Sequence, residues 1–540
     1  KVGSGITLSV DGDIFATGIV TASNFLKSDG SAVGGLSSDS DGNTIGGTNA
    51  GDSITTGSNN TVIGKDSGTA ITTGEQNTAL GAFSLDANTT GNYNTGIGLN
   101  ALTGNTTGSN NTALGVSALK TASTVSNNTA VGYFSLRQNT TGTENSALGS
   151  QALAANTTGN ANIAIGFEAL DANTTGSNNT AVGRSSLGAN TTTDNNTAVG
   201  YYALKVSTTG AENTAVGSNS LVTNTTGTKN AALGAWSLRF NTTGNYNTAA
   251  GYQALTANTT ASNNTAFGYN TLQANTTGDY GTAVGAYSLD ANTTGSSNVA
   301  VGGLSLSGNT TGNSNVAIGV QALQDNTTAD NNTAVGRDAL KLNTTGAENT
   351  AVGANALDAS TTGNNNTAVG RNALGANTTA GSNTSIGAYS LSANTTGGDN
   401  TACGRSALQN NTTGTVNTSV GYNSLQNNTT ASANTAVGYI ALQSNTTGSA
   451  NTAVGKDALA ANTTSNDNTA VGKDALTANT GAENTAVGAM TLESNTSGSQ
   501  NTAVGALALD AVTTAGYNTA IGYLALSAST TSGSTAVGHR

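Results

Sequence analysis

The chain alternates polar and apolar residues in a short phrase that recurs every 17 residues. In the copy at 128–144 the phrase reads NTAVGYFSLRQNTTGTE, and we number its positions 1 to 17 from the leading Asn. Position 2 is usually Thr and sometimes Val or Ile, while position 4 is Val, Ile or Leu in most copies. Side chains two residues apart in a strand point to the same side. We therefore predict a short strand at positions 1 to 4, with positions 2 and 4 facing inward.

The rest of the phrase predicts corners and a second strand. Gly stands at position 5 in all 29 copies, and Leu at position 9 in all 27 copies from Leu85 to Leu526. We expect a turn at that Gly, a second strand near positions 7 to 10, and a return turn at Asn-Thr-Thr-Gly, because Gly and Asn tolerate positive φ. Two copies, which start at Asn468 and Asn518, lose one residue in or after that return turn. The abundance of Gly, Asn and Thr excludes helix.

A fixed short period is typical of a fold in which each unit stacks on its neighbours. We predict an all-β, parallel β-solenoid of about 29 coils of 17 residues, with equivalent residues of successive coils ~4.8 Å apart. Positions 4 and 9 should fill the interior. The predicted core column comprises Val131, Ile165, Val182, Val199, Leu136, Leu170 and Leu187.

Small residues form two further columns. Position 3 is nearly always Ala, and position 8 is Ala, Ser or Thr. If position 4 faces inward, position 3 faces outward, and a stripe of small residues there would let another chain approach closely; the alternative is that small residues simply suit a crowded coil. A second buried face would also add hydrophobic area that a thin coil lacks. The predicted chain–chain interface comprises Ala113, Ala130, Ala181, Ala198, Ala118, Ala152 and Ala169.

The phrase N-[TIV]-A-[VI]-G-x-x-[AS]-L, repeated over residues 60–538, resembles the head repeat of trimeric autotransporter adhesins of the YadA type. The resemblance implies a left-handed parallel β-roll wound as a homotrimeric rod. The present coil is a few residues longer, through its Asn-Thr-Thr-Gly corner, and in this it is similar to repeats of phage tail fibres, particularly those of marine phages. The opening segment, residues 2–26, is also similar to stretches of such fibres.

The organisation along the chain has three parts. Residues 1–42 lack the phrase and contain two strand-like stretches, Ile6–Val10 and one beginning at Ile14, so we expect an N-terminal β segment or cap. Residues 43–76 are degenerate repeats, in which Asn43-Thr44-Ile45-Gly46 looks out of step and the copy at Asn60 lacks the Leu of position 9. Regular repeats run over 77–540 and stop mid-coil, so we expect the chain to be part of a longer protein.

Composition limits the kinds of partner that the chain is expected to bind. The net charge of −12, spread thinly over 540 residues, argues against nucleic acid or an anionic membrane as a partner. There is no apolar run near 18 residues, so we expect no membrane insertion. The single Cys403 stands at position 4 and is predicted to be a buried thiol. The repeated Asn-Thr-Thr triplets match the glycosylation pattern, but we interpret them as turns.

Candidate chemistry is sparse. We expect no cofactor, metal site or catalytic set, because His539 is the only His and no nucleophile stands with a base. Acidic residues fall at position 10 or just before the next Asn, where we interpret them as solvated: Asp86, Asp171, Asp290, Asp358, Asp510, Glu212, Glu348 and Glu483. The variable positions 6 and 7 give a candidate recognition column, unless these side chains merely cover the surface: Tyr133, Tyr201, Trp236, Tyr252, Tyr269, Arg337, Arg371 and Arg405.

These observations, together with the resemblance, favour a non-enzymatic structural role. The expectation is the shaft of a host-attachment fibre on a virion surface, which presents a receptor-binding end to a cell-surface receptor or glycan and contacts itself and other virion proteins. A bacterial trimeric surface adhesin, also extracellular, is the main alternative. An ice-binding or other extracellular solenoid, suggested by the Thr pair at positions 13 and 14, is the third.

Overall fold

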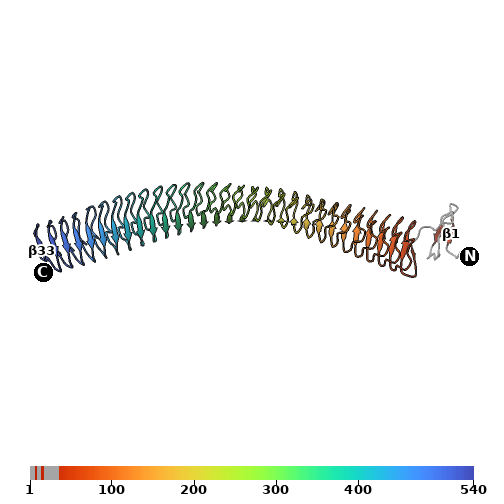
Figure 1. The fold of residues 1–540 in the computed structure, drawn as a ribbon, viewed down its shortest axis with the longest axis horizontal. Helices are drawn as coiled ribbons and strands as arrows, with labels where there is room; N and C mark the ends of the chain where they lie inside the picture. The colour runs from red at the N-terminus through yellow and green to blue at the C-terminus, as the bar shows by residue number, and fades with distance from the viewer. Residues whose placement is uncertain (1–5, 9–13, 17–35, 540) are drawn as a thin grey trace. The chain divides into compact units, whose positions relative to one another are not determined.

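The computed structural model describes residues 6–8, 14–16 and 36–539, and it confirms an all-β parallel solenoid of about 29 turns with 17-residue spacing. None of the described residues is helical. The chain divides into two compact units, residues 1–202 and 203–540. In each unit the coils lie one upon another, with one short strand per coil (Figure 1).

Each strand of the stack covers positions 2 to 4 of its coil. Unit 1 holds β1 Ile6–Leu8, β2 Ile14–Ala16, β3 Ser37–Ser38, β4 Thr44–Gly46, β5 Thr61–Ile63, β6 Thr78–Leu80, β7 Thr95–Ile97, β8 Thr112–Leu114, β9 Thr129–Val131, β10 Ser146–Leu148, β11 Ile163–Ile165, β12 Thr180–Val182 and β13 Thr197–Val199. Unit 2 holds β14 Thr214–Val216, β15 Ala231–Leu233, β16 Thr248–Ala250, β17 Thr265–Phe267, β18 Thr282–Val284, β19 Val299–Val301, β20 Val316–Ile318, β21 Thr333–Val335, β22 Thr350–Val352, β23 Thr367–Val369, β24 Thr384–Ile386, β25 Thr401–Cys403, β26 Thr418–Val420, β27 Thr435–Val437, β28 Thr452–Val454, β29 Thr469–Val471, β30 Thr485–Val487, β31 Thr502–Val504, β32 Thr519–Ile521 and β33 Thr535–Val537.

From β4 onward the strands pair in parallel with a register of one repeat. For example, Thr129, Ala130 and Val131 of β9 pair with Ser146, Ala147 and Leu148 of β10. Across the short coil the register drops by one residue, so that Thr469 pairs with Thr485. Equivalent residues of successive coils therefore form continuous columns along the stack in each unit.

The predicted direction of the strand side chains is wrong. Ala at position 3 is completely buried inside its own coil, whereas positions 2 and 4 face outward. Of the predicted core column, Leu136, Leu170 and Leu187 are fully buried. The other four residues lie on the outer face: Val131, Val182 and Val199 are half-buried, and Ile165 is 38% exposed.

The narrowness of the coil explains this inversion. A Cβ built on Gly96, at position 3, lies 3.2 Å from the Leu85 Cγ of the preceding coil and 3.3 Å from the Ala101 carbonyl oxygen. Ala therefore just fills the space beside Leu, and a column of Val would be overpacked. Ser385 is accommodated because its hydroxyl donates a hydrogen bond to the Ser390 carbonyl.

The predicted second strand is also absent. Positions 6 to 11 form a continuous turn, in which the residues at positions 7 and 9 have positive φ, as at Phe134 (58°) and Leu136 (48°). This backbone is held by its neighbours. The Phe134 N–H donates to the Val116 carbonyl of the preceding coil and the Leu136 N–H to the Ala152 carbonyl of the next. Stacking thus stabilises a conformation that Leu rarely adopts alone.

The invariant Gly of position 5 has a steric cause. Gly132 has φ of 132°, and a Cβ built on it would lie 2.4 Å from the Gly149 carbonyl oxygen of the next coil. No side chain fits at that distance, so the corner requires Gly.

Two buried columns of Asn satisfy the backbone at the other corners. At position 1, the Asn128 Oδ1 accepts from the Asn145 backbone N–H at 3.0 Å, while the Asn145 Nδ2 donates to the Gly159 carbonyl at 2.9 Å. At position 12, the Asn156 Nδ2 donates both to the Asn139 Oδ1 and to the Gly159 carbonyl. These ladders join successive coils by hydrogen bonds and do not require apolar side chains at the corners.

The first coils of the stack join in register, which corrects the sequence interpretation of Asn43. Thr44 pairs with Thr61, so the coil that begins at Asn43 is in step with the one at Asn60. Most of the predicted N-terminal segment lies outside the described residues. Its described parts are β1 and β2, which form an antiparallel pair, and residues 36–42, in which β3 pairs antiparallel with β4 of the first coil.

Candidate functional site

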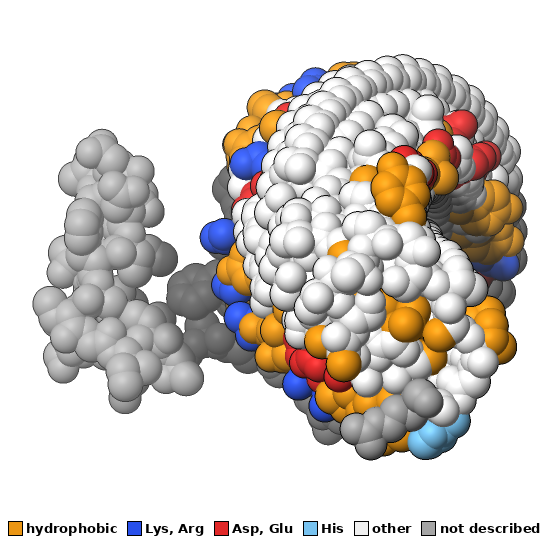
Figure 2. All heavy atoms as spheres, turned by 90° about the vertical axis from the view of Figure 1, so that its left-hand side faces the viewer, with side chains coloured by type: hydrophobic (Ala, Val, Ile, Leu, Met, Phe, Trp, Pro, Cys, Tyr) orange, Lys and Arg blue, Asp and Glu red, His pale blue; other side chains and the backbone are white. Residues whose placement is uncertain are grey.

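The outer side chains of the strands form a continuous uncharged surface in each unit. We call the outward side chains at positions 2 and 4 of successive coils the Thr/Val face. None of the 16 Lys and Arg or 28 Asp and Glu residues of the chain falls at positions 1 to 5 of any repeat, although charged residues make up 8% of the chain. In the end-on view, charged side chains, blue and red, gather in a few patches, with wide white and orange areas between the patches (Figure 2).

The apolar side chains of this face are considerably exposed. Leu148 is 50% exposed and Phe267 is 51% exposed, and the other apolar members at position 4 are either half-buried or exposed. Contiguous apolar patches of this kind are rare on soluble monomers and mark association surfaces. The exposed members at position 4 are Leu80, Leu114, Leu148, Ile165, Val216, Leu233, Phe267, Val284, Val301, Ile318, Val352, Ile386, Val420, Val487, Val504, Ile521 and Val537.

The predicted small-residue interface is not on the surface. All seven of its members are completely buried within one chain, so they are part of the coil interior: Ala113, Ala130, Ala181, Ala198, Ala118, Ala152 and Ala169. Cys403, predicted as a buried thiol, is instead exposed on the Thr/Val face. Both corrections follow from the same inversion of the strand, because position 3 faces inward and position 4 outward.

The candidate recognition column lies on the surface, and its positions 6 and 7 follow the Thr/Val face along the chain. Tyr133, Tyr201, Tyr252 and Tyr269 are exposed and Trp236 is half-buried. The three arginines are also exposed. The Arg371 guanidinium lies 4.6 Å from the centre of the Tyr389 ring and that of Arg405 5.9 Å from Tyr422, so part of the column covers itself by cation–π contact.

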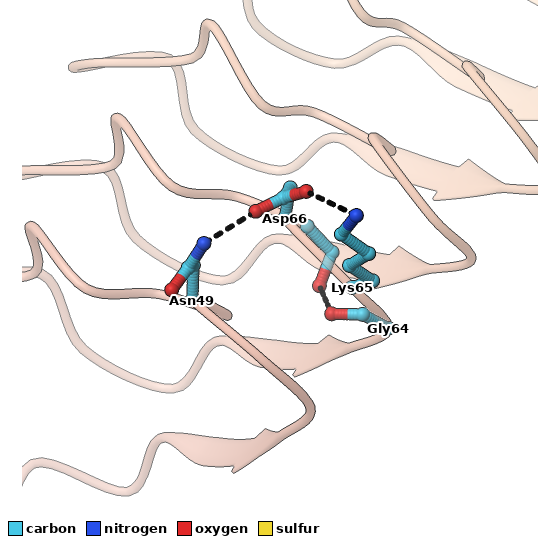
Figure 3. A network of polar contacts seen from close by, with 5 residues as sticks. Asn49, Gly64, Lys65 and Asp66 are labelled. Atoms are coloured by element: carbon cyan, nitrogen blue, oxygen red, sulfur yellow. Dashed lines mark hydrogen bonds and ion pairs between the residues drawn. The ribbon is translucent and has the colours of Figure 1, made fainter.

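Charges at positions 6 and 7 of some coils neutralise each other locally. Lys456 and Asp457 approach to 3.1 Å, and Lys473 and Asp474 to 3.2 Å. Figure 3 shows the equivalent group near the N-terminal end of the stack, where the Asp66 carboxylate accepts from Asn49 of the preceding coil at 2.7 Å and lies 3.8 Å from the Lys65 Nζ. Exposed pairs of this kind stabilise little.

The carboxylates of position 10 differ from the sequence interpretation, because they are half-buried and not fully solvated. Burial raises the pKa of Asp290, and it likewise raises the pKa of Asp86, Asp171 and Asp358. One oxygen each of Asp86, Asp290 and Asp510 is buried without a hydrogen-bond partner. Among the described residues, no three His, Cys, Asp or Glu side chains come together as metal ligands would.

The Asn-Thr-Thr corners leave little free polar chemistry. Asn156 and its equivalents are completely buried, so these Asn side chains are inaccessible to glycosylation in the folded chain. At position 13 the Thr157 hydroxyl donates to the Thr174 carbonyl of the next coil at 2.9 Å. The threonines of position 14, such as Thr158, are exposed. In the described part of the chain no helix could span a membrane.

Comparison with known proteins gives no assignment. No protein-family model matches the chain, and no curated protein or solved structure is significantly similar to it.

Proposed function

We propose that the chain is the shaft of a host-attachment fibre on a virion, in which identical chains lie parallel and in register with their Thr/Val faces in contact. The proposal is non-enzymatic: the shaft extends and presents a receptor-binding end. It rests on one observation above all, the absence of charge from positions 1 to 5 of every repeat, although positions 2 and 4 face outward.

A solvated surface gives no reason for that restriction. Lys or Glu at positions 2 or 4 would improve solubility and disfavour association along the whole stack. A repeated contact with another chain supplies the reason. A standard interface buries about 800 Å² of accessible surface per partner. The coils from β14 to β33 of unit 2 reach this area if each coil buries about 40 Å² of its surface against the partner chain. One half-exposed Leu side chain already presents a larger accessible area than this.

The number of chains follows from the resemblance to trimeric adhesin repeats, and three Thr/Val faces around a common axis would give a homotrimer. The earlier basis for a trimer, an outward stripe of Ala, does not hold, and the Thr/Val face replaces it. A bacterial surface adhesin would use the same shaft and differ in what anchors it. Antibodies against the repeat would then label the cell envelope and not purified virions.

The test compares Lys substitutions on two faces of the same coils. In the face variant, Val182→Lys, Val352→Lys and Val437→Lys put cations at position 4. The control variant carries Thr192→Lys, Thr362→Lys and Thr447→Lys at the exposed position 14 of those coils. Light scattering should give about three times 52.5 kDa for the wild type and the control, and 52.5 kDa for the face variant. A monomeric wild type, or a face variant that still associates, would contradict the proposal.

A further inference from the structure

Four successive coils of unit 2 place aromatic rings in an unbroken row, which we call the aromatic strip: Trp236, Tyr252, Tyr269 and Tyr287. The ring centres are 5.5, 5.6 and 5.3 Å apart along the row. Trp236 and Tyr287 stand at position 7 of their coils and the two middle rings at position 6. Other ring contacts in the described residues join only two side chains, as at Tyr422 and Tyr439.

The rings overlap only partly. Tyr252 and Tyr269 are nearly parallel, at 9°, but their centres are 5.6 Å apart, which is the spacing of offset stacking and not of face-to-face contact. Tyr252, Tyr269 and Tyr287 accordingly remain 41%, 46% and 39% exposed. The row thus presents parts of several ring faces, together with phenol hydroxyls, over a length of three coil spacings.

Neutral amides flank the rings. Gln253 and Asn270 stand at position 7 between Trp236 and Tyr287, and the Gln273 Nε2 donates to the Gln253 Oε1 at 3.4 Å. This bond leaves the Gln253 Nε2 and the Gln273 Oε1 free to bond elsewhere. Asn270 is only 9% exposed and its Oδ1 is buried, so the amide groups that a ligand could reach are those of the half-buried Gln253 and Gln273. The strip therefore contains unused donors and acceptors of neutral type.

Charge is confined to the ends of the strip. No charged residue stands at positions 6 or 7 of these four coils. At one end the Arg239 guanidinium lies 5.3 Å from the Trp236 ring and 4.9 Å from Phe240, and at the other Asp290 follows Tyr287 by three residues. Desolvation and a hydrogen bond with Tyr269 raise the pKa of the Tyr287 phenol.

We infer that the aromatic strip binds a neutral polysaccharide lying along the stack. Pyranose rings offer flat apolar C–H faces, which pack on aromatic rings, and hydroxyls, which bond to amides and phenols. The rings recur at about the length of one sugar unit in an extended chain. An anionic polysaccharide would find no cation at the centre of the strip. This inference is independent of the fibre proposal, because the strip belongs to one chain in either case.

The only Trp of the chain lies in the strip, so its fluorescence reports on the site directly. We would titrate the full chain with cellohexaose, laminarihexaose and, as the anionic comparison, hexagalacturonate. At least one neutral hexasaccharide should change the Trp236 emission saturably, and hexagalacturonate should not. Tyr252→Ala with Tyr269→Ala should weaken that binding at least tenfold, whereas the matched pair Tyr422→Ala with Tyr439→Ala should leave it unchanged.

Thermal unfolding of the two double variants separates binding from stability. Loss of saccharide binding with a melting temperature equal to that of the Tyr422/Tyr439 variant would support the inference. No response to either neutral hexasaccharide, an equal response to hexagalacturonate, or equal weakening by both variants would overturn it.

Discussion

The ladder of Asn at position 12 has gaps, and filling one of them should stabilise the fold. Asn309, Asn326 and Asn343 each donate to the Oδ1 of the preceding Asn at 2.8 to 3.0 Å. At the next coil Ser360 replaces Asn, and there both the Asn343 Oδ1 and the Ser360 hydroxyl are buried without a partner. The ladder resumes where Asn394 donates to Asn377.

The substitution Ser360→Asn should restore three hydrogen bonds. The new amide would donate to the Asn343 Oδ1 and to the Gly363 carbonyl, and would accept from the Asn377 Nδ2, which now bonds only the Ala380 carbonyl at 3.0 Å. A buried unsatisfied group costs about 1–3 kcal/mol. Subtracting the side-chain entropy of the added amide, we expect a local gain of about 2 kcal/mol.

Hydrogen exchange is the appropriate assay, since each coil of a repeat array opens with its neighbours and not with the whole chain. A gain of about 2 kcal/mol should slow exchange in peptides from residues 349–383 by about 30-fold. The control Asn309→Ser opens an intact part of the ladder and should speed exchange in its own coil. Unchanged or faster exchange in Ser360→Asn would refute the reasoning that unpaired ladder atoms weaken the stack.

Other gaps and corners give further predictions. Asn105 and Asn495 also have an unpaired Oδ1, facing coils with Ala122 and Val512 at position 12, so Val512→Asn should likewise slow exchange in residues 501–517. Gly132→Ala should unfold its coil at a cost of about 3 kcal/mol or more, because its Cβ would meet the Gly149 carbonyl oxygen at 2.4 Å. The control Gly303→Ala, whose Cβ would come no closer than 3.9 Å to the Ala286 carbonyl oxygen, should be much milder in thermal melts. Burial raises the pKa of Asp290 above its unfolded value of 3.8, so its charge destabilises the fold above the raised pKa, and this penalty disappears as the pH falls towards 3.8. Asp290→Asn should therefore raise the melting temperature at pH 7 but not at pH 3.5, while Asp194→Asn at an exposed corner should change neither; a gain that persists at pH 3.5 would rule out charge burial as the cause.

The period, a strand at the start of each repeat, the parallel stack and the buried Leu of position 9 were predictable from the sequence, whereas the second strand predicted near positions 7 to 10 was wrong. The direction of the strand was not predicted, because alternation alone fits either direction when the width of the coil is unknown. A signal was present in the first coils. Val62 replaces Ala at position 3 only where Gly68 replaces Leu at position 9, and Ile71 then fills the interior. A Cβ on Gly68 would lie 3.1 Å from Val62, so positions 3 and 9 share one space.

The left-handed backbone at positions 7 and 9 was beyond sequence reasoning. Leu136 and its equivalents adopt positive φ, which Leu rarely does, because hydrogen bonds from both neighbouring coils determine the turn. The aromatic strip was only partly predictable. Trp236, Tyr252 and Tyr269 belong to the predicted column, but Tyr287 was missed, since its place beside Tyr269 depends on how positions 6 and 7 curl around the corner.

Cys403 offers the most direct test of association through the Thr/Val face. It is exposed at position 4 of β25, so parallel chains in register would bring their Cys403 side chains to one level. A short bismaleimide should then link wild-type chains in pairs on a denaturing gel. The control Thr413→Cys with Cys403→Val, which moves the thiol to the exposed position 14 of the same coil, should be labelled but not linked. Complete labelling of Cys403 without linkage would contradict the account.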